Sequence, residues 1–305
     1  MSIELGQFTT INGQPQWITI RGNDSANPVL LIISGPGAAL SRMAEFFAPW
    51  QKDFTLVQWD QPNAGATLAK SAAPVTLSIE RIVQDGIAAT EFVCSTLKVR
   101  KIAVLGISAG TIIALHLVKR RPDLFSAYVG TGQMVNWAHQ DFLSYETLLG
   151  DARDAGNAAM VAELEGLGPP PYASAAADLI KSKYAAALTA AERQASISLD
   201  SSISAGMHAT ATAAYDALRT EIMEFDAHSL GLEFAVPMFF LQGELDVYTV
   251  TSEVWLYAEE IQAPQKEFDL IEGGGHSVFL MRDAFLAALN FHVRATALNG
   301  ATHAE

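Results

Sequence analysis

The sequence has little cysteine and a deficit of positive charge. Cys94 is the single cysteine among 305 residues, which excludes an intramolecular disulfide and favours a reducing compartment. Lysine and arginine number 19 against 33 aspartate and glutamate residues, a formal net charge of −14. Because this excess of negative charge repels phosphate groups, we expect neither nucleic acid nor an anionic membrane surface as a partner.

Long apolar runs and metal-binding patterns are also absent. No uninterrupted apolar stretch approaches the ~20 residues of a membrane span, and residues 1–5 lack the basic region and apolar run that begin a secretory signal. No pair of the seven histidines has the spacing of a metal site. We therefore expect a cytoplasmic protein without metal or cofactor, a monomer or small homo-oligomer that acts on a small molecule.

Hydrophobic residues, by contrast, make up 50% of the chain, enough for a large core. Short apolar runs alternate with stretches of helical periodicity, after an initial hairpin around Asn12-Gly13. This alternation predicts an α/β fold with a mostly parallel central sheet and helices on both faces. The predicted strands are 29–33, 54–59, 101–105, 126–131, 236–242 and 266–271, and the predicted helices are 41–50, 76–97, 111–121, 252–262 and 278–297.

One long segment departs from this alternation. Residues 136–230 are rich in alanine and other helix formers and contain no strand-like run. We therefore predict a core domain made of residues 1–135 and 231–305, with residues 136–230 inserted as a helical cap.

A Gly-x-Ser-x-Gly pattern, Gly106 to Gly110 with Ser108 at its centre, lies between a predicted strand and a predicted helix. In this context the pattern is typical of a nucleophile elbow, in which a sharp turn exposes the serine and glycines let the backbones approach closely. The following helix directs its N-terminal N–H groups at the place where negative charge develops. The alternative is a glycine-rich turn with an idle serine.

Asp246 and His276 follow two later predicted strands. Because the carboxyl ends of parallel strands share one edge of a sheet, both residues are expected near Ser108. His276 would act as the base and Asp246 would orient it, in the order Ser–Asp–His. Glu244 is a competing acid, while a turn aspartate and a surface histidine are the plainer interpretations.

Two backbone N–H groups are candidates for an oxyanion hole. Ala109 follows the nucleophile, and Gly35 lies in the loop after the first buried strand. Pro36 has no N–H and cannot contribute. Ser34 either adds a hydroxyl to the pocket or only caps the loop.

Several of these motifs together resemble those of proline iminopeptidases and their α/β-hydrolase relatives. They are Pro36-Gly37, Trp59-Asp60-Gln61, the Gly-x-Ser-x-Gly elbow, Gly243-x-x-Asp246 and Gly273-Gly274-Gly275-His276. The resemblance covers about residues 5–135 and 231–295. It implies a cap over the active site and hydrolysis through a seryl intermediate.

The chain departs from the family pattern around the oxyanion region. Ile33-Ser34-Gly35 replaces His-Gly-Gly, Pro62-Asn63 interrupts the Asp-Gln-Arg-Gly motif, and Ala109 replaces a tryptophan. The small side chains, including those of Ser34 and Asn63, predict a roomier pocket. We therefore expect inefficient prolyl aminopeptidase activity.

The family resemblance also implies carboxylates in the cap that hold a substrate's amino terminus. Glu146 and Glu221 are candidates for this role. Together with Ser34 and Asn63 they are the predicted residues of the substrate pocket. Asp200, Asp216 and Glu224 are further candidates, and each of these acids is alternatively a solvated helix residue.

These patterns favour a serine hydrolase that uses Ser108, His276 and Asp246 through an acyl-enzyme on esters, lactones or small amides. A proline iminopeptidase-type aminopeptidase is one alternative. Others are a lyase or acyl transferase that uses the same residues, and a non-catalytic protein that binds a ligand under the cap.

Overall fold

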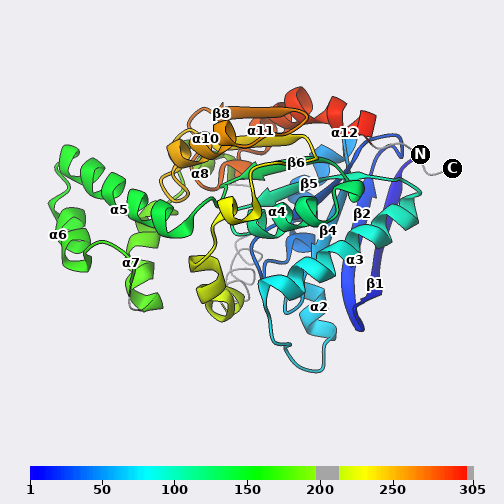
Figure 1. The fold of residues 1–305 in the computed structure, drawn as a ribbon, viewed down its shortest axis with the longest axis horizontal. Helices are drawn as coiled ribbons and strands as arrows, with labels where there is room; N and C mark the ends of the chain where they lie inside the picture. Colours follow the sequence, from blue (N-terminus) through cyan, green and yellow to red (C-terminus); the bar gives the residue numbers. More distant parts are fainter. Residues whose placement is uncertain (173, 197–212, 301–305) are drawn as a thin grey trace.

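A single eight-stranded sheet organises the protein in a computed structural model, which describes residues 1–172, 174–196 and 213–300. The strand order is β1-β2-β4-β3-β5-β6-β7-β8 (Figure 1). Strands β1, β2 and β4 pair antiparallel, and all pairings from β4 to β8 are parallel. The strands are β1 Ile3–Ile11, β2 Gln14–Gly22, β3 Val29–Ile33, β4 Thr55–Asp60, β5 Ile102–Ile107, β6 Phe125–Thr131, β7 Met238–Gly243 and β8 Lys266–Ile271.

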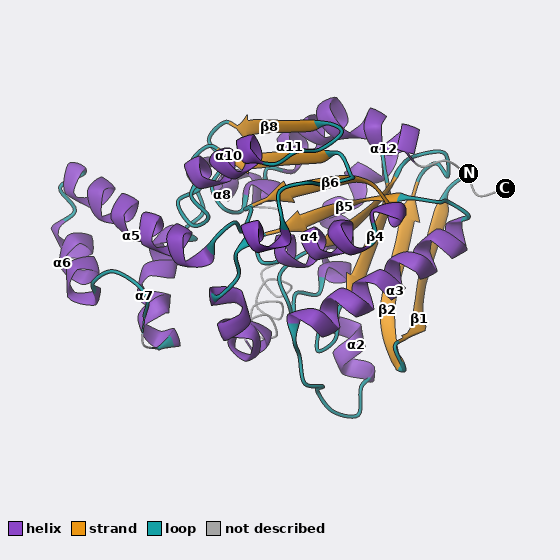
Figure 2. Cartoon of the chain, in the orientation of Figure 1, coloured by secondary structure: helices purple, strands orange, loops and turns teal. Residues whose placement is uncertain are grey.

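Each face of the sheet builds its own hydrophobic core, because alternate side chains of a strand point to opposite faces. In β3, Leu31 and Ile33 join one cluster, whereas Leu30 and Ile32 join the other. The first cluster includes side chains of α3 Ile79–Leu97, α4 Gly110–Arg120 and α10 Thr251–Glu260. The second is covered by η1 Leu40–Met43, α1 Ala44–Phe47, η2 Ala48–Lys52, η5 Val278–Leu280, α11 Arg282–Ala288, η6 Leu289–Val293 and α12 Arg294–Gly300. Of these elements, α11 and α12 are labelled in Figure 2.

The described part of residues 136–230 is helical. Its elements are α5 Trp137–Asp154, α6 Ala158–Leu167, α7 Ala175–Ala185, α8 Ala190–Ser196, helical residues 213–223 and η4 Ala227–Leu230. Helices α5, α6 and α7 extend to one side of the sheet (Figure 1). The two ends of the segment meet, because the Ala227 N–H donates to the Val135 carbonyl at 2.7 Å and the Trp137 N–H to the Phe225 carbonyl at 3.1 Å.

Several helices differ from the sequence prediction. The predicted helix 41–50 is broken into η1, α1 and η2, and Pro49 at the start of η2 lacks the N–H that a continuing helix needs. Helix α3 begins at Ile79 rather than Thr76, because the Ser78 hydroxyl accepts from the Arg81 N–H and caps it. The predicted helix 278–297 consists of η5, α11, η6 and α12, while α2 Gly65–Lys70 and η3 Pro122–Leu124 were not predicted.

Candidate active site

Ser108 lies at a strained turn between β5 and α4. Its φ of +53° falls in the left-handed region, which non-glycine residues seldom adopt. The flanking glycines are required by contact: a Cβ on Gly110 would lie 2.3 Å from the Ile33 carbonyl oxygen, and one on Gly106 would lie 2.8 Å from Thr111 Cα. The Thr111 hydroxyl also donates to the Ser108 carbonyl at 2.6 Å. This turn therefore has little freedom to relax.

Three polar side chains meet at the carboxyl edge of the sheet. His276 Nε2 lies 2.8 Å from Ser108 Oγ, and His276 Nδ1 lies 3.1 Å from Asp246 Oδ2. The residues come from the loops after β5, β7 and β8. The His276 side chain is 11% exposed and that of Asp246 is fully covered. The structure thus brings together the three residues that the sequence predicts as a triad.

The Asp246 carboxylate is held by four donors in addition to His276. Gln242 Nε2 and the Thr249 hydroxyl donate to Oδ2 at 2.8 and 2.6 Å. The Tyr248 and Thr249 N–H groups donate to Oδ1 at 2.8 and 3.0 Å. Burial acts to raise the pKa of Asp246, but the charge and hydrogen bond of His276 and the bonds from Thr249 outweigh it and lower the pKa. Asp246 is therefore ionised and fixed in orientation.

Glu244, the competing acid, contacts a different part of the loop. Its Oε2 accepts from the Gly273 N–H at 3.0 Å, and its side chain is exposed. Asp246 rather than Glu244 therefore lies against His276.

The two residues predicted to supply the oxyanion donors, Gly35 and Ala109, lie next to each other beside Ser108. A Cβ on Gly35 would lie 3.5 Å from Ala109 Cβ, and the structure gives neither N–H an acceptor among the residues that it describes. The Gln61 side chain donates to the Ser34 carbonyl at 3.0 Å and fixes the loop that carries Gly35. Gly35 and Ala109 both line the pocket that contains Ser108.

A pocket of about 420 Å³ opens at Ser108 and His276. The core contributes Ser34 and both oxyanion candidates, whereas α5, α7 and the helical residues 213–223 contribute Trp137, Asp178, Leu179, Ser182, Tyr215 and Asp216. The Tyr248 ring packs on His276 with centroids 4.6 Å apart. The lining residues are Ser34, Gly35, Pro36, Ala38, Ser108, Ala109, Met134, Trp137, Asp178, Leu179, Ser182, Tyr215, Asp216, Tyr248 and His276.

Two carboxylates, Asp178 and Asp216, line this pocket. Burial, reinforced by the charge of Asp141, raises the pKa of Asp178. Lys181 is fully buried and pairs with Asp141 rather than with either pocket acid. Its Nζ also lies 5.5 Å from the centroid of the Tyr248 ring. The sequence indicates Asp216 as a candidate but not Asp178, because polar residues at helical spacing have the same pattern on a solvated face as on a pocket wall.

The other predicted pocket residues lie elsewhere. The Asn63 amide binds the Val75 backbone, with Nδ2 donating to the carbonyl and Oδ1 accepting from the N–H, both at 2.8 Å. Glu221 accepts from the Ile79 N–H at 2.9 Å and caps α3. Glu146 and Glu224 are not among the residues that line the pocket. Asn63, Glu146 and Glu221, which the sequence predicts in the pocket, are thus not among the residues that line it. Asp200 lies outside the described residues.

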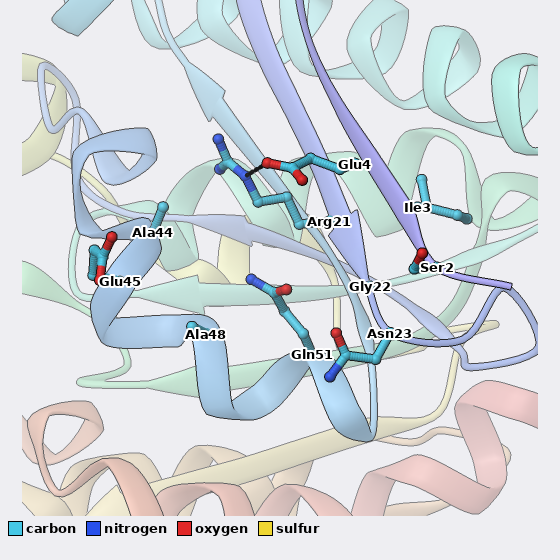
Figure 3. A pocket seen from close by; sticks show the side chains of 10 residues that line it. All are labelled: Ser2, Ile3, Glu4, Arg21, Gly22, Asn23, Ala44, Glu45, Ala48 and Gln51. Carbon is cyan, nitrogen blue, oxygen red and sulfur yellow. Dashed lines mark ion pairs between the residues drawn. The ribbon is translucent and has the colours of Figure 1, made fainter.

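A second hollow, of about 370 Å³, lies between the start of β1, the end of β2 and the η1–η2 region. Figure 3 shows Arg21 and Glu4 directed toward each other there, with the guanidinium nitrogen and carboxylate oxygen 4.0 Å apart. None of the residues that line it belongs to the site at Ser108.

Features of two other protein classes are missing from the described residues. These residues hold no group of three or more histidine, cysteine, aspartate or glutamate side chains arranged to bind a metal ion. Within the same ranges, no helix has the length and apolar character needed to cross a membrane.

Comparison with known proteins finds a matching family and a related protein. Residues 24–283 match the sequence profile of the family described as "Serine aminopeptidase, S33". A probable aminopeptidase, YbaC, of Bacillus subtilis (strain 168) is 25% identical over 312 residues, covering 96% of this chain and 97% of the relative.

Solved structures resemble the chain over nearly its whole length. A proline iminopeptidase-related protein of Thermus thermophilus superposes with a TM-score of 0.68 at 16% identity, covering 98% of this chain and 99% of the other. A proline iminopeptidase of Mycobacterium smegmatis superposes with a TM-score of 0.65 at 16% identity, covering 97% and 99%. At these identities the likeness establishes the fold alone, that of α/β-hydrolases.

Proposed function

Since the chain belongs to the serine aminopeptidase family of α/β-hydrolases, we propose that it hydrolyses its substrate through an acyl-enzyme on Ser108. The observation that carries the proposal is the continuous contact from Ser108 Oγ to His276 to Asp246, at 2.8 and 3.1 Å. We propose as substrates small-molecule esters, lactones and small amides. The cytoplasmic location and the oligomeric state expected from the sequence stay predictions.

In this mechanism Ser108 attacks the substrate carbonyl while His276 Nε2 takes the hydroxyl proton. Asp246 stabilises the imidazolium that forms. The N–H groups of Gly35 and Ala109 hold the oxyanion, and the first turn of α4 adds its positive dipole end. His276 then protonates the leaving group, and a water molecule repeats the sequence to release the acid and restore Ser108.

The residues 136–230 act in this proposal as a cap that closes the substrate pocket. The position of Asp178 on α7 and of Asp216 on the helical residues 213–223, both in the wall around Ser108, supports this role. Such a wall excludes water from the acyl-enzyme site and selects substrates by shape and charge.

Turnover of p-nitrophenyl butyrate by the native chain and by Ser108→Ala tests the reaction. The native chain should show a burst of nitrophenol followed by steady turnover, because the activated ester acylates Ser108 faster than water releases the acyl group. Ser108→Ala should show neither. A variant that retains the burst would mean that another residue is the nucleophile.

A second candidate function is that of an aminopeptidase, which Asp178 and Asp216 favour. An ammonium group buried in the pocket needs an opposite charge, and these are the two carboxylates of the described pocket wall. The same acids would repel a substrate that carries a carboxylate. The raised pKa of Asp178 would fall when a cation binds beside it.

This candidate is tested with alanyl p-nitroanilide and its N-acetyl derivative on the native chain, Asp178→Asn and Asp216→Asn. An aminopeptidase loses activity when the amino group is blocked, and the Asn variants raise KM for the free amine only. Glu146→Gln, a change on α5 outside the pocket lining, is the control and should leave KM unchanged. Equal turnover of free and acetylated substrates would exclude the aminopeptidase.

A further inference from the structure

Glu192 is a buried carboxylate of the 136–230 segment that contacts the loop before His276. It lies in α8 and is 0% exposed. Its Oε1 accepts from the Gly275 N–H at 2.9 Å, across 83 residues of sequence. Its Oε2 accepts from the Thr189 N–H at 2.9 Å. Neither oxygen lines the substrate pocket, so Glu192 is separate from the acids Asp178 and Asp216.

Half of this arrangement is an ordinary helix cap. Thr189 and Glu192 exchange bonds, because the Thr189 hydroxyl also accepts from the Glu192 N–H at 3.1 Å. Such a capping box needs only one carboxylate oxygen of the glutamate. The second oxygen is directed at Gly275, and burying a charge there is costly unless both oxygens find donors.

The contact at Gly275 is close enough that a side chain there would force Thr189 or Glu192 to shift. A Cβ at that position would lie 2.9 Å from Thr189 Cγ2 and 3.1 Å from Glu192 Oε2. The loop is fixed at a second N–H as well, since Glu244 accepts from Gly273. Alternate N–H groups of the loop are therefore held by two acids, one exposed on the core and one buried in the 136–230 segment.

We propose that Glu192 is a positioning residue for His276. Through its bond to Gly275, Glu192 keeps His276 within reach of Ser108 while α8 lies against the core. Without α8 against the core, the Gly275 N–H and the Glu192 carboxylate would both lose a partner in a buried setting, so this contact couples the position of the Gly275 loop to that of α8. His276 follows Gly275 directly, and its contacts with Ser108 and Asp246 depend on the path of this loop. The proposal makes formation of a competent base depend on the contact between α8 and the Gly275 loop, and it rests on the function proposed above.

The test compares Glu192→Asp with Thr189→Val. Aspartate can still accept from the local N–H of Thr189, but it is one methylene too short for Gly275. Valine removes the capping hydroxyl and keeps the methyl group that packs on Gly275. We expect Glu192→Asp to lower kcat on p-nitrophenyl butyrate about 10- to 100-fold with little change in KM, as misplaced reacting groups do. The rate at which diisopropyl fluorophosphate modifies Ser108 should fall in parallel, whereas Thr189→Val should stay near native.

Two results would overturn the proposal. A native kcat in Glu192→Asp would mean that the bond to Gly275 does not position His276. An equal loss of kcat in Thr189→Val would mean that the loss comes from helix capping alone. Should Glu192→Asp fail to fold by circular dichroism, Glu192→Ala replaces it, because alanine leaves the Gly275 N–H without its acceptor. The same loss of kcat supports the proposal and a native kcat overturns it. A native chain that neither cleaves the ester nor reacts with the fluorophosphate would instead contradict the function itself.

Discussion

At the scale of single residues, the orientation of His276 depends on which acid contacts it. Asp246 meets His276 Nδ1 and is held by four further donors, whereas Glu244 binds only a loop N–H on the surface. Both acids follow β7, but their side chains make different contacts, so their substitution should have different effects.

Asp246→Asn should lower kcat by roughly 10³- to 10⁴-fold, because the amide favours the wrong tautomer of His276. Glu244→Gln should lower kcat by less than about tenfold, since the contact with Gly273 is solvent-exposed and contributes little. Steady-state kinetics on one ester compares the two. A larger loss in Glu244→Gln would identify Glu244 as the catalytic acid.

The pocket acids show where sequence reasoning stops at this scale. Ser108, Asp246 and His276 could be predicted, because each directly follows a recognisable strand or precedes a recognisable helix. Asp178 could not, because nothing in the sequence of α7 says which of its faces packs inward. Glu221 was assigned to the pocket on the same weak basis, and it caps α3 instead.

At the scale of elements, the elbow between β5 and α4 is the most constrained. Gly110 approaches the Ile33 carbonyl so closely that any side chain must push α4 away from β3. The Ser108 turn and the Gly35 loop would then move apart. The N–H groups of Gly35 and Ala109, which we propose as the oxyanion donors, would separate with them.

We therefore expect Gly110→Ala to lower the free energy of unfolding by about 1–3 kcal/mol, the usual cost of overpacking, and to lower kcat as well. Gly150→Ala is the matched control, because Gly150 lies in α5 and a Cβ there would meet no atom within 4 Å beyond its own helix. Urea unfolding followed by circular dichroism measures the stability of both variants. A Gly110→Ala variant as stable and active as Gly150→Ala would contradict the packing argument.

The base of the 136–230 segment contains a titratable contact. His228 in η4 lies 2.8 Å from an oxygen of Asp226 and 3.0 Å from an oxygen of Glu260 on α10, with the Tyr257 ring against it. Burial acts to lower the pKa of His228, but the bonds to Asp226 and Glu260 outweigh it and raise the pKa above 6.5. Protonated His228 therefore links the end of the segment to the core.

A raised pKa stabilises the fold fully below pH 6.5, and this contribution is lost as the pH rises through the folded-state pKa. His228→Asn should thus lower Tm by about 1–2 °C at low pH, as expected for a half-exposed ion pair. The difference from the native chain should shrink at alkaline pH. Thermal melts across this range provide the measurement, and a Tm difference that grows with pH would contradict the assignment.

Element boundaries were predictable to different degrees for physical reasons. Strands β3 and β8 occupy the predicted residues. The uninterrupted apolar run of β3, and the bounded run of β-formers in β8, each allow only one position for the strand. The helix expected over 41–50 broke at Pro49, and the C-terminal helix broke into four pieces as it follows the sheet. Tertiary packing decides such breaks, and helical periodicity does not show them.

At the scale of the whole molecule, the fold is shared with a solved proline iminopeptidase, while the resemblance in sequence motifs is interrupted around the expected oxyanion region. An amine is a poorer leaving group than a phenolate, so amide hydrolysis demands better aligned oxyanion donors and proton transfer. The altered residues Ser34, Pro62 and Ala109 belong to the family's motifs in that region.

We therefore expect kcat/KM for p-nitrophenyl butyrate to exceed that for prolyl p-nitroanilide. Both substrates should be measured on one preparation at one pH. Ser108→Ala measures the background rate for each. A prolyl anilide value equal to or above the ester value would mean that these departures leave the iminopeptidase activity intact.

The central claim is that Ser108 is a nucleophile activated by His276, and covalent labelling tests it most directly. Intact-mass and peptide mass spectrometry after treatment with a fluorophosphonate should find one adduct on the native chain, on the peptide that holds Ser108. His276→Ala should react far more slowly, and Ser108→Ala should not react at all. An adduct on another residue, or a native chain that stays unlabelled while it hydrolyses esters, would contradict the account.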